Sequence, residues 1–154
     1  MRRTWTITAA AVAVAALVAL AAGCGGGGDK KGYALSQAEY AAALNGICND
    51  VSSKTESLDL GSLEGFAANG DELLSIIEEA TDKAKALTPP DELKDAAERF
   101  NGGAEDSVSA VKDALEAAKD GDQEKFDEAG QKASEADGRQ DEAAKEIGAT
   151  DCLS

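Results

Sequence analysis

The spacing of apolar residues constrains the fold of this 154-residue chain more than any other feature. Along four stretches between residues 36 and 147, apolar side chains recur at intervals of three, four and seven positions, the period of one face of an α-helix. The alternation of apolar and polar residues that indicates a β-strand does not occur in the sequence. The pattern therefore predicts an all-α fold in which each helix buries one face.

The first predicted helix begins at a capping box formed by Ser36 and Glu39, whose side chains each accept a hydrogen bond from the other residue's backbone N–H. We expect this helix to end near residues 52–55. Its apolar face consists of Tyr40, Leu44, Ile47, Cys48 and Val51. Cys48 is therefore expected among core residues.

The second predicted helix ends at Pro89 and Pro90, since proline lacks a backbone N–H and restricts the residue before it. Asn69 and Gly70 are expected to break its first turns. Its apolar face consists of Phe66, Leu73, Ile77, Ala80, Ala84 and Leu87.

Asp91 is placed to cap a third helix, and two adjacent glycines, Gly102 and Gly103, lie within that helix. Because a glycine inside a helix costs roughly 1 kcal/mol relative to alanine, we expect a kink or local fraying there. The apolar face consists of Leu93, Ala97, Phe100, Ala104, Val108, Val111, Leu115 and Ala118. A tight connection follows at residues 120–122.

The fourth predicted helix has a seam made mostly of alanine, which Gln140 alone interrupts, and Gly148 caps its C-terminal end. The seam consists of Phe126, Ala129, Ala133, Ala136, Gln140, Ala143 and Ile147. Short connections favour an antiparallel bundle of about four helices over residues 36–154. Alanine buries little area, so the predicted core is modest.

The N-terminal segment predicts export and attachment to a membrane. A basic start at Arg2 and Arg3 precedes an apolar stretch at residues 7–20, as in a secretory signal. Residues 20–24, Leu-Ala-Ala-Gly-Cys, then resemble the lipobox of bacterial lipoproteins, with Ala21 where leucine is usual. The resemblance implies that residues 1–23 are a lipoprotein signal peptide and that the Cys24 thiol receives a diacylglyceryl group.

Under this interpretation residues 24–35 are a lipidated cysteine followed by a glycine-rich tether, and the bundle domain lies on the extracytoplasmic face of the cell membrane. Two or more acyl chains, each methylene contributing about 0.8 kcal/mol, hold a protein stably on a bilayer. The alternative is a transmembrane helix, but the apolar stretch is shorter than the roughly 20 residues that a crossing needs.

With Cys24 assigned to lipid, Cys48 and Cys152 remain as an even pair in an oxidising compartment, which predicts a disulfide. In an up-down bundle the end of the fourth helix lies beside the start of the first, whereas Cys48 is about 18 Å further along at 1.5 Å per residue. Either the C-terminal tail folds back or the first helix starts later. A free nucleophilic thiol is the alternative, but the chain has no histidine to activate it.

Charge and composition argue against several functions. The signal peptide carries two of the 15 basic residues and none of the 30 acidic ones, so the mature chain has a net charge of −17, which opposes nucleic-acid binding. The absence of histidine disfavours zinc and hydrolase chemistry. Asp120, Asp122 and Glu124 resemble the start of a calcium loop, but Lys125 stands where that loop needs glycine. We therefore predict no enzyme activity, no catalytic residues, no metal and no cofactor.

Three segments resemble a group of small actinobacterial lipoproteins of unknown function. They are LSQAEYAAALNGICN at residues 35–49, LTPPDEL at 87–93 and KEIGATDC at 145–152, in which Ile147 takes the place of a usual leucine. The resemblance implies an all-α domain with Cys48 paired to Cys152, and it implies no activity.

Two functions fit these features. The leading hypothesis is an interaction module that presents an acidic face of the bundle to another envelope protein. The alternative is a carrier or sensor that holds a small apolar or cationic ligand between loosely packed helices. An apolar pocket would favour the carrier, and an exposed contiguous apolar patch would favour the module.

Overall fold

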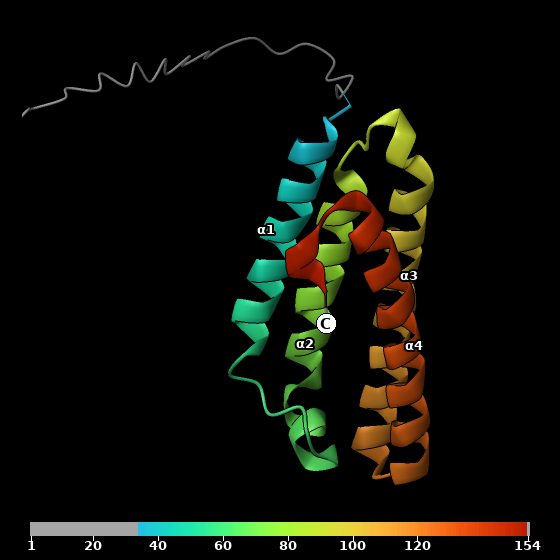
Figure 1. Cartoon of the computed structure of the whole chain (residues 1–154). Helices are drawn as coiled ribbons and strands as arrows, with labels where there is room; N and C mark the ends of the chain where they lie inside the picture. The colour runs from blue at the N-terminus through green and yellow to red at the C-terminus, as the bar shows by residue number, and fades with distance from the viewer. Residues whose placement is uncertain (1–33, 154) are drawn as a thin grey trace, which may run out of the picture. The chain divides into compact units, whose positions relative to one another are not determined.

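The computed structural model describes residues 34–153, which form an antiparallel four-helix bundle with two short 3-10 helices (Figure 1). The elements are α1 (Gln37–Thr55), α2 (Leu63–Ala86), η1 (Asp91–Leu93), α3 (Lys94–Asp120), α4 (Gln123–Ile147) and η2 (Thr150–Cys152). The predicted all-α fold is confirmed, with no β-strand in residues 34–153. The predicted signal peptide, Cys24 and nearly all of the tether lie outside the described residues.

Helix α1 begins and ends where the sequence predicts. The Glu39 carboxylate accepts a hydrogen bond of 2.9 Å from the Ser36 backbone N–H, and the Ser36 hydroxyl accepts one of 3.4 Å from the Glu39 N–H. The hydrogen bonds from the Ser36 side chain and backbone lower the pKa of Glu39. The helix ends at Thr55, where the hydroxyl donates to the Val51 carbonyl at 3.0 Å.

Helix α2 runs through Asn69 and Gly70 without a break, so the expected interruption is wrong. The Asn69 amide donates to the Gly65 carbonyl at 2.9 Å and to the Asp59 carbonyl at 3.2 Å, which ties the preceding loop to the helix. A Cβ on Gly70 would lie 2.7 Å from a methyl of Leu115. Gly70 therefore makes room for α3.

Helix α3 differs from prediction at its start. Asp91 does not cap it, because the chain first forms the 3-10 turn η1, and α3 starts at Lys94 without a side-chain cap. Asp91 instead forms an ion pair of 2.6 Å with Lys94.

The expected kink at Gly102 and Gly103 is also wrong, since α3 is continuous from Lys94 to Asp120. A Cβ on Gly103 would lie 3.0 Å from the Cβ of Gln140 and 3.2 Å from the backbone oxygen of Ala136. Close packing of α3 against α4 offsets the low helix propensity of glycine at this position. A Cβ on Gly102 would meet nothing within 4 Å.

The buried residues form two separate clusters. The upper core joins α1, the end of α2, the start of α3 and the end of α4, and its larger members include Tyr40, Leu44, Leu93, Phe100 and Ile147. The lower core joins the start of α2, the end of α3 and the start of α4, and is built around Phe66, Ala114, Leu115, Ala118 and Ala129. The rings of Phe66 and Phe126 meet edge to face with centroids 5.2 Å apart. The middle of the bundle belongs to neither core.

Candidate functional site

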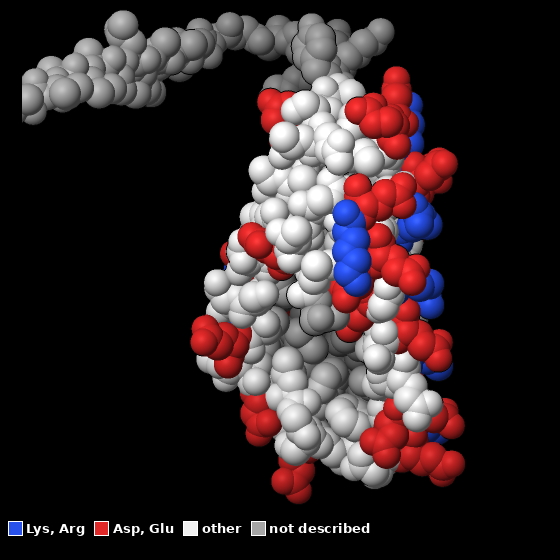
Figure 2. All heavy atoms as spheres, viewed as in Figure 1, with Lys and Arg blue, Asp and Glu red and all other residues white. Residues whose placement is uncertain are grey.

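A pocket of about 280 Å³ occupies the middle of the bundle, at the level where the two cores are separated. Its lining residues on α2, α3 and α4 fall between the residues that each helix contributes to the upper core and those it contributes to the lower core, apart from Ala84 and Phe100, which the pocket shares with the upper core. Figure 2 shows this face of the molecule hollowed between the side formed by α1 and α2 and the side formed by α4. The pocket is therefore a gap in the hydrophobic core that opens to one face.

Three walls of the pocket are largely apolar. Helix α2 contributes Ile77, Ala80, Thr81 and Ala84, helix α3 contributes Phe100, Ala104 and Ser107, and helix α1 contributes Ile47, Cys48, Val51 and Ser52. The Thr81 hydroxyl donates to the Ile77 carbonyl at 2.7 Å, so it is engaged within its own helix. The small side chains of Ala80, Ala84, Ala104 and Ser107 on α2 and α3 leave part of this space open.

The C-terminal tail forms a fourth wall. Gly148, in the left-handed conformation with φ of 90°, turns the chain after α4, and the fully buried Ala149 leads into η2. The backbone N–H of Asp151 donates to the side-chain oxygen of Asn45 at 2.9 Å, and the Asn49 amide donates to the Asp151 carboxylate at 2.9 Å. Two asparagines on α1 thus fix the direction of the tail.

The tail ends on α1 through the predicted disulfide between Cys48 and Cys152, whose Cα atoms are 5.1 Å apart. The Gln37 amide donates to the Ile147 carbonyl at 3.4 Å, so the end of α4 lies beside the start of α1, as an up-down bundle requires. The tail then folds back along α1 to reach Cys48. Of the two alternatives that the sequence leaves open, the folded-back tail is confirmed.

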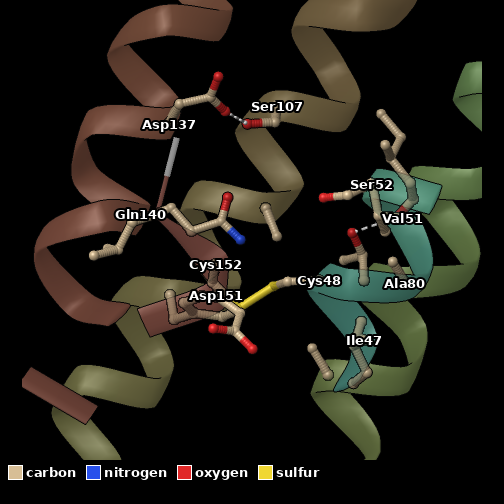
Figure 3. Close-up of a pocket in the computed structure, with 16 residues that line it drawn as sticks. Ile47, Cys48, Val51, Ser52, Ala80, Ser107, Asp137, Gln140, Asp151 and Cys152 are labelled. Atoms are coloured by element: carbon tan, nitrogen blue, oxygen red, sulfur yellow. Dashed lines mark hydrogen bonds between the residues drawn. A yellow bond between two sulfur atoms is a disulfide. The ribbon is translucent and has the colours of Figure 1, made fainter. Parts of the chain in front are cut away.

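The pocket also has polar lining residues, namely Ser52, Thr81, Ser107, Asp137, Gln140 and Asp151. Asp137 and Gln140 of α4 are half-buried, whereas Asp151 of the tail is exposed (Figure 3). The Ser107 hydroxyl donates to the Asp137 carboxylate at 3.0 Å. The Gln140 amide projects toward the pocket and makes no hydrogen bond with any described residue (Figure 3). No lysine or arginine of residues 34–153 lines this pocket.

The sequence carries one signal for this site. Gln140 interrupts the apolar seam of the fourth helix, where its Cβ packs close to Gly103 of α3 and its amide lies at the pocket. Asp137 and Asp151 have no such signal, since each resembles an ordinary surface carboxylate in the sequence. Asp137 could be inferred only by placing it one turn before Gln140 on the same face.

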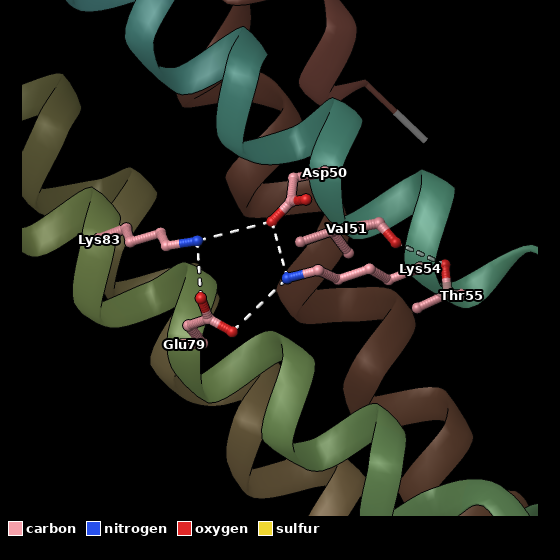
Figure 4. A network of polar contacts seen from close by, with 6 residues as sticks. All are labelled: Asp50, Val51, Lys54, Thr55, Glu79 and Lys83. Atoms are coloured by element: carbon pink, nitrogen blue, oxygen red, sulfur yellow. Dashed lines mark hydrogen bonds and ion pairs between the residues drawn. The ribbon is translucent and has the colours of Figure 1, made fainter.

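The lower part of α1, next to the pocket residue Val51, is held to α2 by four alternating charges (Figure 4). Within the helices, Lys54 lies 2.9 Å from Asp50 and Lys83 lies 2.8 Å from Glu79. Between the helices, Lys54 lies 3.6 Å from Glu79 and Lys83 lies 3.5 Å from Asp50. We call these four residues the α1–α2 charge cluster.

The acids that resemble a calcium loop are used at helix ends. The Asp122 carboxylate accepts a hydrogen bond of 3.1 Å from the Lys125 backbone N–H and so caps α4, and this contact lowers the pKa of Asp122. Asp120 is the last residue of α3, and Gly121 takes the left-handed conformation with φ of 72°. No group of three or more potential metal ligands occurs among residues 34–153.

Comparisons with known proteins add no family assignment. None of the helices in the described part is both long enough and apolar enough to cross a membrane. No protein-family model matches the chain, and no curated protein or solved structure gives a significant match. The similarity to small actinobacterial lipoproteins stays a prediction.

Proposed function

We propose that the chain is a non-catalytic binding protein that is anchored on the extracytoplasmic face of the cell membrane and holds a small, mostly apolar molecule in its central pocket. The pocket carries this proposal, because it is a gap between two packed cores lined largely by aliphatic and aromatic side chains. Its volume of about 280 Å³ lies just below the ~300–1,000 Å³ typical of ligand sites. At about 30 Å³ per molecule of liquid water, it corresponds to the volume of roughly nine waters.

The exposed surface supports ligand binding over protein docking. Among the described residues, Leu153 is the only large hydrophobic side chain that is exposed, at 37%, and it lines the pocket itself. A docking face normally presents a larger contiguous apolar area. The one exposed large apolar side chain of the described part thus lies at the pocket.

The proposal is tested by filling the pocket from α2. The full chain in lipid nanodiscs is titrated with 4-phenylbutan-1-ol, a neutral probe of suitable size, and the rise in melting temperature is followed by circular dichroism. Ala80→Leu, which places a larger side chain in the pocket, should abolish most of the rise. Ala68→Leu makes the same change at an exposed position of the same helix and should leave the rise intact. Equal behaviour of the two variants, or no rise for the unaltered chain, would contradict the proposal.

The anchor is a separate part of the proposal. The lipobox at residues 20–24, the basic start and the apolar stretch support lipidation of Cys24 after removal of residues 1–23. Feeding labelled palmitate to cells that produce the chain should label the unaltered protein and leave Cys24→Ala unlabelled. A full-length product with Met1 and an unmodified Cys24 thiol would refute the anchor.

Protein docking is the second candidate function. It is favoured by the acidic residues that gather over α3 and α4 in Figure 2. Crosslinking in intact cells followed by mass spectrometry should then join this acidic face to another envelope protein. Recovery of the monomer alone would argue against docking.

A further inference from the structure

We propose that the pocket selects a small organic cation, a molecule with an apolar body and a protonated amine at one end. This inference rests on the proposed binding function and specifies the chemical class of its ligand. It follows from the charge of the pocket lining, which includes the carboxylates of Asp137 and Asp151 and no basic residue of the described part. A cation is the charge that complements such a lining.

Neither carboxylate forms an ion pair with a basic residue of the described part. All lysines and arginines of residues 34–153 except Lys145 form ion pairs, and none of these pairs includes Asp137 or Asp151. Arg139, two residues from Asp137, is paired with Asp106 of α3 at 2.6 Å. The paired basic residues are thus engaged elsewhere, and no ion pair within residues 34–153 involves either carboxylate at the pocket.

Neutral donors hold both carboxylates in place. Ser107 donates to one oxygen of Asp137 at 3.0 Å, and Asn49 donates to one oxygen of Asp151 at 2.9 Å. The second oxygen of each carboxylate makes no hydrogen bond with a described residue. Each carboxylate therefore keeps one oxygen that can accept a hydrogen bond from an ammonium N–H, with Asp137 half-buried and Asp151 exposed at the rim.

The remaining polar and aromatic groups of the lining fit the same ligand. The carbonyl of the free Gln140 amide can accept a further N–H, and the amide lies on the same helix as Asp137, one turn further along. The apolar body would rest against Ala80, Ala104 and the ring of Phe100. A ligand with an amine at one end and a hydrocarbon at the other satisfies both parts of the lining.

Two probes that differ only at the polar end test the inference. The full chain in nanodiscs is titrated at physiological salt with 4-phenylbutylamine and with 4-phenylbutan-1-ol, and dissociation constants are obtained by NMR. Because a hydrogen bond to a charged group contributes about 1.5–3 kcal/mol, the amine should bind at least about tenfold more tightly than the alcohol. Asp137→Asn and Asp151→Asn should each reduce this preference, and the double variant should remove it.

A matched control separates local recognition from the overall negative charge. Glu135→Gln removes one charge from an exposed position of α4 outside the pocket and should leave the preference unchanged. Unaltered binding of the alcohol by each variant shows that the pocket is still folded. Equal affinity for amine and alcohol, or an equal loss of preference in Glu135→Gln and Asp137→Asn, would overturn the cation assignment while leaving apolar binding in place. Failure of both probes to bind the unaltered chain would overturn both proposals.

Discussion

The two long sides of this bundle are held together in different ways. Helices α3 and α4 meet almost backbone to backbone, since a Cβ on Gly103 would lie 3.2 Å from the Ala136 oxygen. The seam between them is formed largely by buried small residues, including Gly103, Ala104, Ala110, Ala114, Ala117, Ala118, Ala129, Ala136, Ala143 and Ala144. Helix α1 has only two fully buried large side chains, Tyr40 and Leu44, both in its first half. Its second half depends on a disulfide, two asparagine contacts and the α1–α2 charge cluster.

This difference explains why the pocket lies where it does. The wall formed by α3 and α4 is fixed by close helix packing. It is rigid, because closely packed interiors resist changes of volume. The opposite wall, formed by α1, is separated from α4 at this level. The disulfide between Cys48 and Cys152 sets its position there, rather than a layer of large apolar side chains. A bundle in which α1 is attached largely by covalent and polar contacts can keep an open space inside and still be a single folded unit.

Removing the disulfide should have the largest effect. Cys48→Ser combined with Cys152→Ser should lower the free energy of unfolding by about 4 kcal/mol, because the bond closes a loop of roughly 100 residues in the unfolded chain. Urea denaturation of the double variant measures this loss. Amide hydrogen exchange should show α1 and the tail opening before α3 and α4. If all four helices instead exchanged at the same rate, α1 would be no more weakly attached than α3 and α4, contrary to this prediction.

Overpacking the α3–α4 seam should have the next largest effect. Gly103→Leu inserts a side chain against the backbone of α4 and should destabilise the fold by about 3 kcal/mol. Gly102→Leu introduces the same side chain where a Cβ meets nothing within 4 Å, and its gain in helix propensity of roughly 0.8 kcal/mol should appear as a small stabilisation. Denaturant titrations of both variants provide the measurement. Equal effects would show that α3 and α4 are not closely packed at Gly103.

These two neighbouring glycines also show what the sequence can and cannot predict. Apolar spacing, the capping box at Ser36 and the stop at Pro89 depend on local rules, and each was predicted correctly. Whether a glycine weakens a helix or admits a neighbour depends on a residue far away in the sequence, such as Ala136 for Gly103. The same limit applies to Asp91, whose role was taken over by a turn that local preference does not specify.

The candidate site was partly visible in the sequence. The disulfide followed from counting cysteines, and Gln140 was marked as the polar interruption of an apolar seam. Asp137 and Asp151 were not marked, because a carboxylate beside a pocket and a carboxylate in open solvent look alike in a chain with 30 acidic residues. The gap between the two cores depends on how four helices are aligned, and single-helix patterns do not contain that information.

Tyr40 offers a smaller test of how α1 is attached. Its side chain is fully buried in the upper core, and its hydroxyl forms no hydrogen bond with any described residue. Since an unpaired buried hydroxyl costs roughly 1 kcal/mol or more, Tyr40→Phe should leave stability unchanged or raise it by about 1 kcal/mol. Thermal denaturation of the variant measures this change. A clear loss of stability would indicate a hydrogen bond that holds α1 to the core.

The same substitution should change the behaviour of the fold at alkaline pH. Burial raises the pKa of Tyr40 above its ordinary value of 10.0, so the folded state keeps the phenolic proton after the unfolded state has lost it. This contribution to stability is constant below pH 10 and declines as the pH rises further. Tyr40→Phe should therefore lose less stability than the unaltered chain above pH 10. Parallel alkaline curves would contradict a buried phenol.

The α1–α2 charge cluster should have the smallest effect, because all four of its side chains are about half exposed and solvent screens their charges. Side-chain contacts with Lys54 lower the pKa of Asp50, and those with Lys83 lower the pKa of Glu79. A lowered carboxylate pKa stabilises the fold above the ordinary values of 3.8 and 4.5, and this contribution is lost as the pH falls through that range and below. Lys83→Gln should thus weaken the attachment of α1 slightly at neutral pH and have less effect near pH 3. Lys94→Gln, which breaks a pair only three residues apart in sequence, is the control, because it should alter stability without changing hydrogen exchange in α1. If both variants left exchange in α1 unchanged, the second half of α1 would depend on the disulfide and the two asparagines alone.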